Sequence, residues 1–256
     1  WYTTEYWNSG KKTQIASFTL DEACNAPTIT NTTPSSLYED RGKEITITGS
    51  DLLGCTFDIG GVTGSIVSND GSTAVVDFPA GNYANGTLTV TNAVGNDTRS
   101  LTVSTRNSIP VDASTGANTD IHQTIDGAVD GLHAWYGTTA FNSGDLPGTK
   151  TINVNAGTYT EGVNLNSELN PTAANPLIIQ NNSGDAPVVD ASGNNYGFDL
   201  SSVDYIQLKG FSVHSADISN IYLQGDNCEV YYNKVYSGSD ADGIRIETGT
   251  TNNIHN

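Results

Sequence analysis

The sequence has no methionine and few basic residues, with ten lysine and arginine side chains against 28 aspartate and glutamate side chains. The formal net charge of −18 leaves no basic surface that could displace counterions from a phosphate backbone, so we exclude nucleic acid as a partner. No stretch approaches the roughly 18 consecutive apolar residues that a membrane helix requires. We therefore expect no membrane insertion of this segment.

Because the chain begins at Trp1 and lacks methionine, we expect it to be a processed or excised piece of a longer protein. Its three cysteines, Cys24, Cys55 and Cys228, allow at most one disulfide, and a bond between Cys24 and Cys55 is one alternative. The composition is acidic, poor in lysine and rich in threonine and asparagine, which favours an extracellular or cell-surface location.

Charged residues make up only 15% of the chain, whereas glycine, asparagine, threonine and serine are abundant. Such a composition is unfavourable for helices and typical of strands joined by tight turns, so it predicts an all-β protein. Residues 1–26 begin with four aromatic residues, Trp1, Tyr2, Tyr6 and Trp7, and continue with alternating apolar and polar side chains. We interpret them as an N-terminal strand segment or as the end of an upstream domain.

Residues 27–105 are expected to form a β-sandwich, because short alternating runs are separated by glycine, asparagine and proline. The expected strands cover residues 28–30, 44–48, 56–59, 73–78, 87–91 and 101–103. The motifs in this region are Pro27-Thr-Ile29, Ile45-Thr-Ile47-Thr-Gly49, Gly60-Gly61, Val76-Asp-Phe78-Pro79 and Leu88-Thr-Val90. In this order they resemble the TIG/IPT family, and the resemblance implies an immunoglobulin-like (Ig-like) sandwich.

The composition of residues 106–118, with serine, glycine, asparagine and proline, predicts a linker between two domains. A helix is expected directly after it, because apolar residues then recur at helical spacing. Thr119 or Asp120 is the predicted N-cap, and the helix is expected to end near Gly131.

An internal repeat runs through residues 119–256. Apolar residues recur at equal steps at Phe198, Ile221 and Ile244, and other apolar positions, such as Leu208 and Val230, recur at a step one position shorter. Three short strands per turn, with apolar side chains inward at alternate positions, allow a chain to wind as a right-handed parallel β-helix. We therefore predict this fold for residues 119–256.

The beginning of this region adds a second set of motifs. They are Ile152-Asn-Val154, Ala156-Gly157-Thr158-Tyr159, Pro176-Leu-Ile178-Ile179 and Pro187-Val-Val189. Their order after the expected helix is similar to the N-terminal part of pectate-lyase-like β-helix proteins, which implies an N-terminal capping helix. Such proteins include lyases, esterases, hydrolases, tailspikes, adhesins and inert spacers, so the resemblance implies a fold without choosing a function.

A β-helix that stopped at Asn256 would leave its apolar interior and its strand edges open. We expect the coils to continue past this residue or another subunit to stack on them.

The outward side chains on one sheet of the expected coils include a column of Asp199, Tyr222 and Arg245, with about 5 Å between neighbouring strands. Lyases with this fold use calcium-binding carboxylates and an arginine or lysine base on such a face, so the resemblance makes these three residues the catalytic candidates. A surface ion pair of Arg245 with Asp199 or Asp242, or simple solvation of these charges, explains the same pattern, and we favour that interpretation.

Asp240 and Asp242 are two residues apart in a turn that ends in glycine, which is typical of the first half of a calcium-binding loop. Glu247 could supply a third oxygen only if the chain folds back. A turn whose aspartates cap their own backbone explains the same pattern. Ca²⁺ is therefore an open alternative, and no other cofactor is predicted.

Other catalytic motifs are missing from the sequence. The four histidines show no metal-ligand spacing, no serine lies in a G-x-S-x-G motif, and no glycine-rich loop carries a P-loop lysine. We favour a protein without enzymatic activity, and a polysaccharide lyase or a glycoside hydrolase remains the enzymatic alternative.

Three functions fit these features. The first is a secreted bacterial cell-surface protein, structural or adhesive, in which an Ig-like spacer presents a β-helix to carbohydrate, to other copies of itself or to neighbouring domains. The second is a polysaccharide lyase or hydrolase with active coils beyond Asn256. The third is a self-assembling extracellular filament, in which the aromatic N-terminal strand of one copy completes a sheet of the next or covers its open coil. We favour the first, because no catalytic groups converge.

Overall fold

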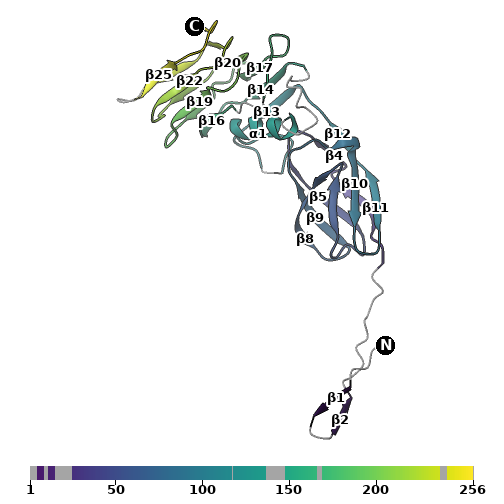
Figure 1. Cartoon of the computed structure of the whole chain (residues 1–256). Coiled ribbons are helices and arrows are strands. Elements are labelled where there is room, and N and C mark those ends of the chain that lie inside the picture. The colour runs from purple at the N-terminus through teal and green to yellow at the C-terminus, as the bar shows by residue number, and fades with distance from the viewer. Residues whose placement is uncertain are drawn as a thin grey trace.

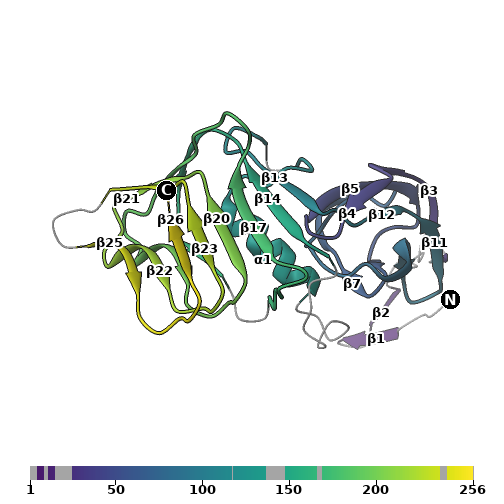
Figure 2. The same ribbon diagram turned by 90° about the horizontal axis from the view of Figure 1, so that it is seen from above.

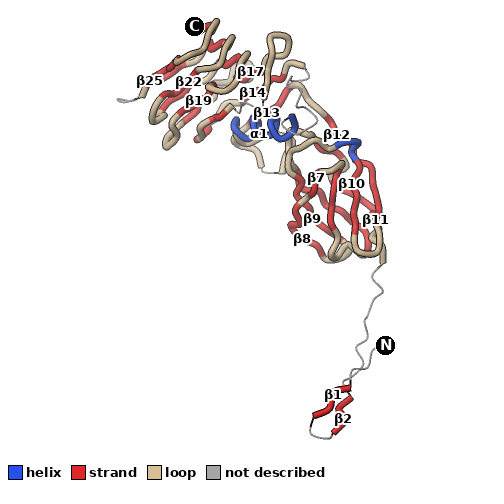
Figure 3. The backbone as a smooth tube through the Cα atoms, viewed as in Figure 1, coloured by secondary structure: helices blue, strands red, loops and turns tan. Residues whose placement is uncertain are grey.

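The computed structural model of the chain describes residues 5–8, 11–14, 25–116, 118–136, 148–165, 169–236 and 241–255. Strands dominate the fold in Figure 3, and the only α-helix among the described residues is α1 (Ile125–Tyr136). A short 3-10 helix, η1 (Ala84–Gly86), adds one turn. The prediction of a protein built mainly from β-strands is confirmed.

At the N-terminus, β1 (Glu5–Asn8) and β2 (Lys11–Gln14) form an antiparallel pair. The predicted disulfide partner Cys24 lies outside the described residues, so its bond with Cys55 stays a prediction. Cys55 is buried, and its Sγ lies 3.3 Å from the carbonyl oxygen of Asp51.

Two four-stranded antiparallel sheets share one apolar core between residues 28 and 104, in the region that follows β2 in Figure 1. The first sheet has the order β3 (Thr28–Thr33), β5 (Lys43–Ser50), β9 (Thr73–Phe78), β8 (Ser65–Asn69). The second has the order β11 (Asn96–Ser100), β10 (Thr87–Thr91), β6 (Thr56–Ile59), β7 (Val62–Thr63). A separate parallel pair consists of β4 (Ser36–Tyr38) and β12 (Thr102–Ser104). We call residues 28–104 the antiparallel region, after its two main sheets.

Strict alternation along the strands explains this core. Ile45 and Ile47 of β5 are fully buried, as are Leu88 and Val90 of β10, while the threonines between them are partly exposed. Gly49 allows β3 to approach closely, because a Cβ atom there would collide with the carbonyl oxygen of Thr28.

Residues 108–255, which we call the parallel region, form three parallel sheets. The β13 sheet has the order β13 (Ser108–Val111), β14 (Lys150–Val154), β17 (Leu177–Asn181), β20 (Ile206–Lys209), β23 (Glu229–Tyr231), β26 (Asn253–His255). The β15 sheet has the order β15 (Thr158–Thr160), β18 (Val188–Asp190), β21 (Ser212–His214), β24 (Lys234–Tyr236). The β16 sheet has the order β16 (Val163–Asn164), β19 (Tyr196–Leu200), β22 (Ser219–Leu223), β25 (Asp242–Ile246). Figure 2 shows strands of these sheets stacked side by side.

The chain visits the three sheets in turn and adds one strand to each on every pass. Phe198 pairs with Ile221 and Ile221 with Ile244, so the equal steps predicted from the sequence set the register of the β16 sheet. The shorter step holds in the β13 sheet, where Leu208 pairs with Val230. These residues turn inward to one continuous apolar core, in which Cys228 is also buried.

Helix α1 begins later than predicted. His122 forms an isolated parallel bridge to β13, so its backbone is paired before the helix starts. The N-cap is Thr124 rather than Thr119 or Asp120, because the Thr124 Oγ1 accepts a hydrogen bond from the Gly127 N–H at 3.0 Å.

The start and the length of α1 both depend on tertiary contacts. The Glu161 carboxylate accepts hydrogen bonds at 2.9 Å from the N–H groups of Ile125 and Asp126, at the positive end of the helix dipole. The helix continues past Gly131, the predicted end, to Tyr136. Its buried face packs on the first strands of the parallel region and consists of Ile125, Ala128, Val129, Leu132 and Trp135.

The structure also differs from the expected linker at residues 106–118. Residues 108–111 form β13, whose Ile109 lies opposite Ile152 of β14. Both side chains are fully buried. The composition of this stretch therefore did not indicate the short strand β13, which is the first strand of the six-stranded sheet.

Candidate functional site

The three catalytic candidates lie side by side on the β16 sheet. Asp199 pairs with Tyr222, and Tyr222 pairs with Arg245, so the predicted column exists in the backbone register. What the column can do depends on the partners of each side chain.

Tyr222 is 8% exposed and stacks on Tyr196, with ring centroids 4.4 Å apart and planes within 10°. Its hydroxyl donates a hydrogen bond to Glu247 Oε2 at 2.7 Å, and Gln224 Nε2 donates to the same oxygen at 2.8 Å. This hydrogen bond to a carboxylate is the main cause that raises the pKa of Tyr222 to about 12. The phenol therefore stays protonated at neutral pH.

Arg245 is held by the same carboxylate, with Nη2 at 2.5 Å from Glu247 Oε1. Its partner is thus Glu247 rather than Asp199 or Asp242. The hydrogen bond to Glu247 raises the pKa of Arg245, which keeps the guanidinium charged. The Asp199 carboxylate accepts a hydrogen bond from the Ser201 N–H at 3.0 Å. Two residues of the column, Tyr222 and Arg245, thus bind the same Glu247 carboxylate, whereas Asp199 bonds the backbone of its own chain segment.

The calcium candidates are only partly within the described residues. Asp240 lies outside them, and Asp242 is exposed at the start of β25. Glu247, the suggested third ligand, is occupied by Tyr222, Gln224 and Arg245. Among the described residues, no group of three or more histidine, cysteine, aspartate or glutamate side chains is arranged to hold a metal ion.

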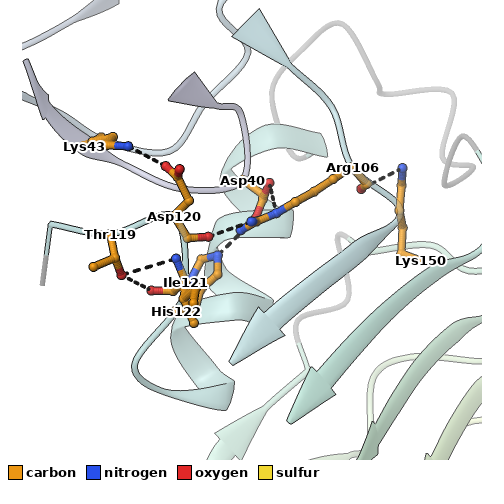
Figure 4. Close-up of polar contacts among 8 residues, drawn as sticks. All are labelled: Asp40, Lys43, Arg106, Thr119, Asp120, Ile121, His122 and Lys150. Carbon is orange, nitrogen blue, oxygen red and sulfur yellow. Dashed lines mark hydrogen bonds and ion pairs between the residues drawn. The ribbon is translucent and has the colours of Figure 1, made fainter. Parts of the chain in front are cut away.

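The most completely buried charge cluster lies at the junction of the antiparallel and parallel regions (Figure 4). Asp40, which follows β4, is fully buried. Arg106 donates to its carboxylate through Nε, at 3.1 Å from each oxygen, and through Nη2 at 2.7 Å from Oδ2. His122 Nε2 lies 3.1 Å from the same Oδ2. We call these three residues the junction cluster.

Further contacts extend the junction cluster outward. Arg106 Nη1 donates to the carbonyl oxygen of Asp120 at 2.6 Å, and its guanidinium lies 4.5 Å from the ring centroid of Tyr38. Lys43 Nζ lies 2.6 Å from Asp120 Oδ1. Gly131 of α1 packs against the cluster so closely that a Cβ atom there would collide with the carbonyl oxygen of Asp40.

The electrostatics of the junction cluster follow from its burial. Burial alone would raise the pKa of Asp40, but hydrogen bonds from His122 and Arg106 outweigh it and hold the pKa below its ordinary value. Burial lowers the pKa of His122, against the opposing pull of Asp40. The cluster is therefore built around an ionised Asp40 that Arg106 neutralises, with a His122 that resists protonation.

A cavity of about 590 Å³ lies beside the cluster, between the antiparallel region and α1. Glu44, Asp77 and Asp130 are among its lining residues. The Asn118 side chain spans the two regions by donating to Glu44 Oε2 at 2.7 Å.

Analysis of the sequence missed the junction cluster. Arg106 and Asp40 are 66 residues apart, and His122 and Asp40 are 82 apart, so no local pattern relates them. One signal was present, because Arg106 is the only lysine or arginine between Arg99 and Lys150, in a stretch with the composition of a linker.

Comparison with protein-family models, with curated proteins and with solved structures finds no match to the chain. No helix in the described part of the chain is long and apolar enough to cross a membrane.

Proposed function

We propose that the chain belongs to a secreted bacterial surface protein with a structural or adhesive role. In this proposal, the antiparallel region is a TIG/IPT-like spacer, and the parallel region is a right-handed parallel β-helix with α1 as its N-terminal cap. The strand order, and the step of 22 to 24 residues between positions paired in the last coils, support this assignment. The spacer holds the β-helix for contact with carbohydrate or with other subunits.

The observation that carries the proposal is the junction cluster. A spacer that merely tethers needs only a flexible linker. Here a fully buried carboxylate accepts from Arg106 and lies within hydrogen-bond distance of His122, and such a cluster is costly unless its geometry is kept. This arrangement favours a fixed orientation of the two regions, which suits the presentation of a binding surface.

Catalysis has less support. An arginine base or a tyrosinate would have to lose a proton, but Glu247 binds both Arg245 and Tyr222 in their protonated forms. We therefore assign no catalytic step to these residues.

A glycan array probed with the fluorescently labelled full chain tests the proposal, together with light scattering of the same sample. We expect binding to at least one class of glycan or self-association that depends on concentration. A strictly monomeric chain that binds no glycan would contradict the proposal.

Small-angle X-ray scattering tests the fixed orientation. We expect the wild-type curve to fit one arrangement of the two regions, whereas Arg106→Ala should require a broader ensemble. Arg99→Ala removes an arginine whose bond to the Thr30 carbonyl stays within the antiparallel region, and it serves as the matched control. Equal curves for all three proteins would show that the junction cluster does not set the orientation.

A further inference from the structure

The outer face of the β13 sheet changes character at its last three strands. Gln207, Glu229 and Asn253 are paired in register on β20, β23 and β26 and point outward. In the part of the chain that the structure describes, their side chains make no hydrogen bond to the protein. They line a groove of about 290 Å³ together with Tyr205, Asn227 and Thr251. The groove thus offers amide, carboxylate and hydroxyl groups to a ligand.

An aromatic ridge runs beside this groove. It consists of Lys209, Tyr231 and His255, which form the next outward column on the same strands. The rings of Tyr231 and His255 are stacked, with centroids 5.2 Å apart and planes within 11°, and the Lys209 ammonium lies 5.6 Å from the Tyr231 centroid. Both faces of the Tyr231 ring are therefore occupied by its neighbours in the column.

Tyr232 extends the ridge in a different orientation. Its ring stands at 69° to Tyr231 and at 79° to His255, and it is 63% exposed. The two tyrosine rings thus meet in a T-shaped contact, and most of the Tyr232 side chain is left open to solvent.

The backbone of Tyr232 is strained. Its φ of 56° is in the left-handed region, which bulky residues rarely adopt. In the coil before it, the equivalent position is Gly210, which follows Lys209 as Tyr232 follows Tyr231. The φ of Gly210 is 85°. Glycine adopts this conformation without steric cost, so the turn itself does not require a tyrosine. An exposed aromatic residue kept at a strained position points to a role in contact with a ligand.

We propose that this face binds a neutral saccharide chain. The groove residues hydrogen-bond the sugar hydroxyls, and the exposed ring of Tyr232 stacks on a pyranose ring. The path from Asn227 to Tyr232 spans at most about 16 Å, at about 3.3 Å per residue, which is room for more than one ring. A neutral chain fits better than an acidic one, because Glu229 lies in the groove and the protein carries a formal charge of −18. The inference rests on the proposed function and assigns its carbohydrate contact to one face.

Affinity electrophoresis of the full chain tests the assignment, in native gels that contain a soluble β-glucan, galactomannan or xylan, with polygalacturonate as the anionic probe. We expect at least one neutral polymer to retard the wild-type chain. Glu229→Ala and Tyr232→Gly should each weaken that retardation at least fivefold. Tyr232→Gly should not lower the urea midpoint, because glycine relieves the backbone strain, so lost binding would not reflect unfolding.

Tyr236→Ala is the matched control, because Tyr236 is also an exposed tyrosine, at 56%, but lies on β24 of the β15 sheet. It should bind as the wild type does. If the wild type binds and the Glu229 and Tyr232 variants bind equally well, the inference is overturned while the proposed function stands. If only polygalacturonate retards the chain, the neutral class is wrong. If the wild type binds none of these polymers and no glycan on the array, the inference is overturned, and the proposed function falls with it only if the chain is also strictly monomeric.

Discussion

The two ends of the β13 sheet differ in what their outward polar side chains bond, although the strands are paired in the same parallel way. Near the junction, outward polar side chains bond one another, since Asn153 Nδ2 donates to Ser108 Oγ at 2.8 Å and Gln180 Nε2 donates to Asn153 Oδ1 at 2.7 Å. At the far end, the side chains of Glu229 and Asn253 make no hydrogen bond to any other described residue. Polar groups that are satisfied internally stabilise the fold, whereas groups left open are available to a ligand.

The junction cluster is the most buried group of polar side chains that bond one another. Asp40→Ala should therefore have the largest effect on stability. It leaves Arg106 buried without its counter-charge, so we expect the free energy of unfolding to fall by about 3–5 kcal/mol. Urea denaturation measures this loss. Asp217→Ala, at an exposed aspartate, should change it by no more than about 0.5 kcal/mol. Equal effects of the two variants would contradict a structural role for Asp40.

Gly131→Ala should have the next largest effect. The added Cβ would collide with the Asp40 carbonyl oxygen, so α1 has to shift away from the antiparallel region, at a cost of about 1–3 kcal/mol. Thermal unfolding followed by circular dichroism checks this loss. Gly116→Ala has open space around its Cβ and should be close to neutral.

The junction cluster should also make stability depend on pH. Burial holds the pKa of His122 below its ordinary value of 6.5, so the unfolded chain binds a proton that the folded chain excludes. Stability is then fully present above pH 6.5 and falls on acidification, by at most about 1.4 kcal/mol per pH unit.

His122→Gln removes this titration, and we expect its stability to fall less steeply than that of the wild type just below pH 6.5. Burial raises the pKa values of Glu39 and Glu161, which act in the opposite direction. Their contributions are common to both proteins and cancel in the difference. Parallel profiles for the two proteins, measured by urea denaturation, would show that His122 binds its proton equally well in the folded and the unfolded chain.

The smallest expected loss of stability concerns two asparagines on the outer face of the β13 sheet, Asn153 and Asn253. Asn153→Ala breaks the bonds to Ser108 and Gln180 and should cost about 1 kcal/mol. Asn253→Ala removes a side chain with no bond to described residues and should be neutral within about 0.5 kcal/mol. If urea denaturation gave equal losses of unfolding free energy for the two variants, the distinction between internally bonded and unbonded side chains on this face would be wrong.

The repeat of apolar residues in the parallel region could be predicted without a structure. The equal steps from Phe198 to Ile221 and from Ile221 to Ile244 predicted the register, because inward side chains of stacked parallel strands must all be apolar. The start of α1 was not readable, because pairing of His122 with β13 competes with the helix for the same backbone. Likewise, the linker composition of residues 108–111 hid β13, whose burial depends on β14.

The predicted column of Asp199, Tyr222 and Arg245 shows a similar division. Its register could be predicted, but its chemistry could not, because Glu247, two residues after Arg245, binds both that side chain and Tyr222. Hydrogen bonds of this kind depend on side-chain reach across neighbouring strands, which a periodic pattern does not contain.

The sequence by itself determined that the chain is mainly strand, that it carries a net charge of −18, and that apolar residues repeat in register along its second half. These properties depend on local propensity and on spacing, which are present in any conformation of the chain. Only the tertiary structure decided that Asp40 meets Arg106 and His122, and that Tyr232 stands open beside a groove with Glu229. Both arrangements depend on burial and on distances between residues that are remote in sequence or that lie on stacked strands, and folding alone creates them.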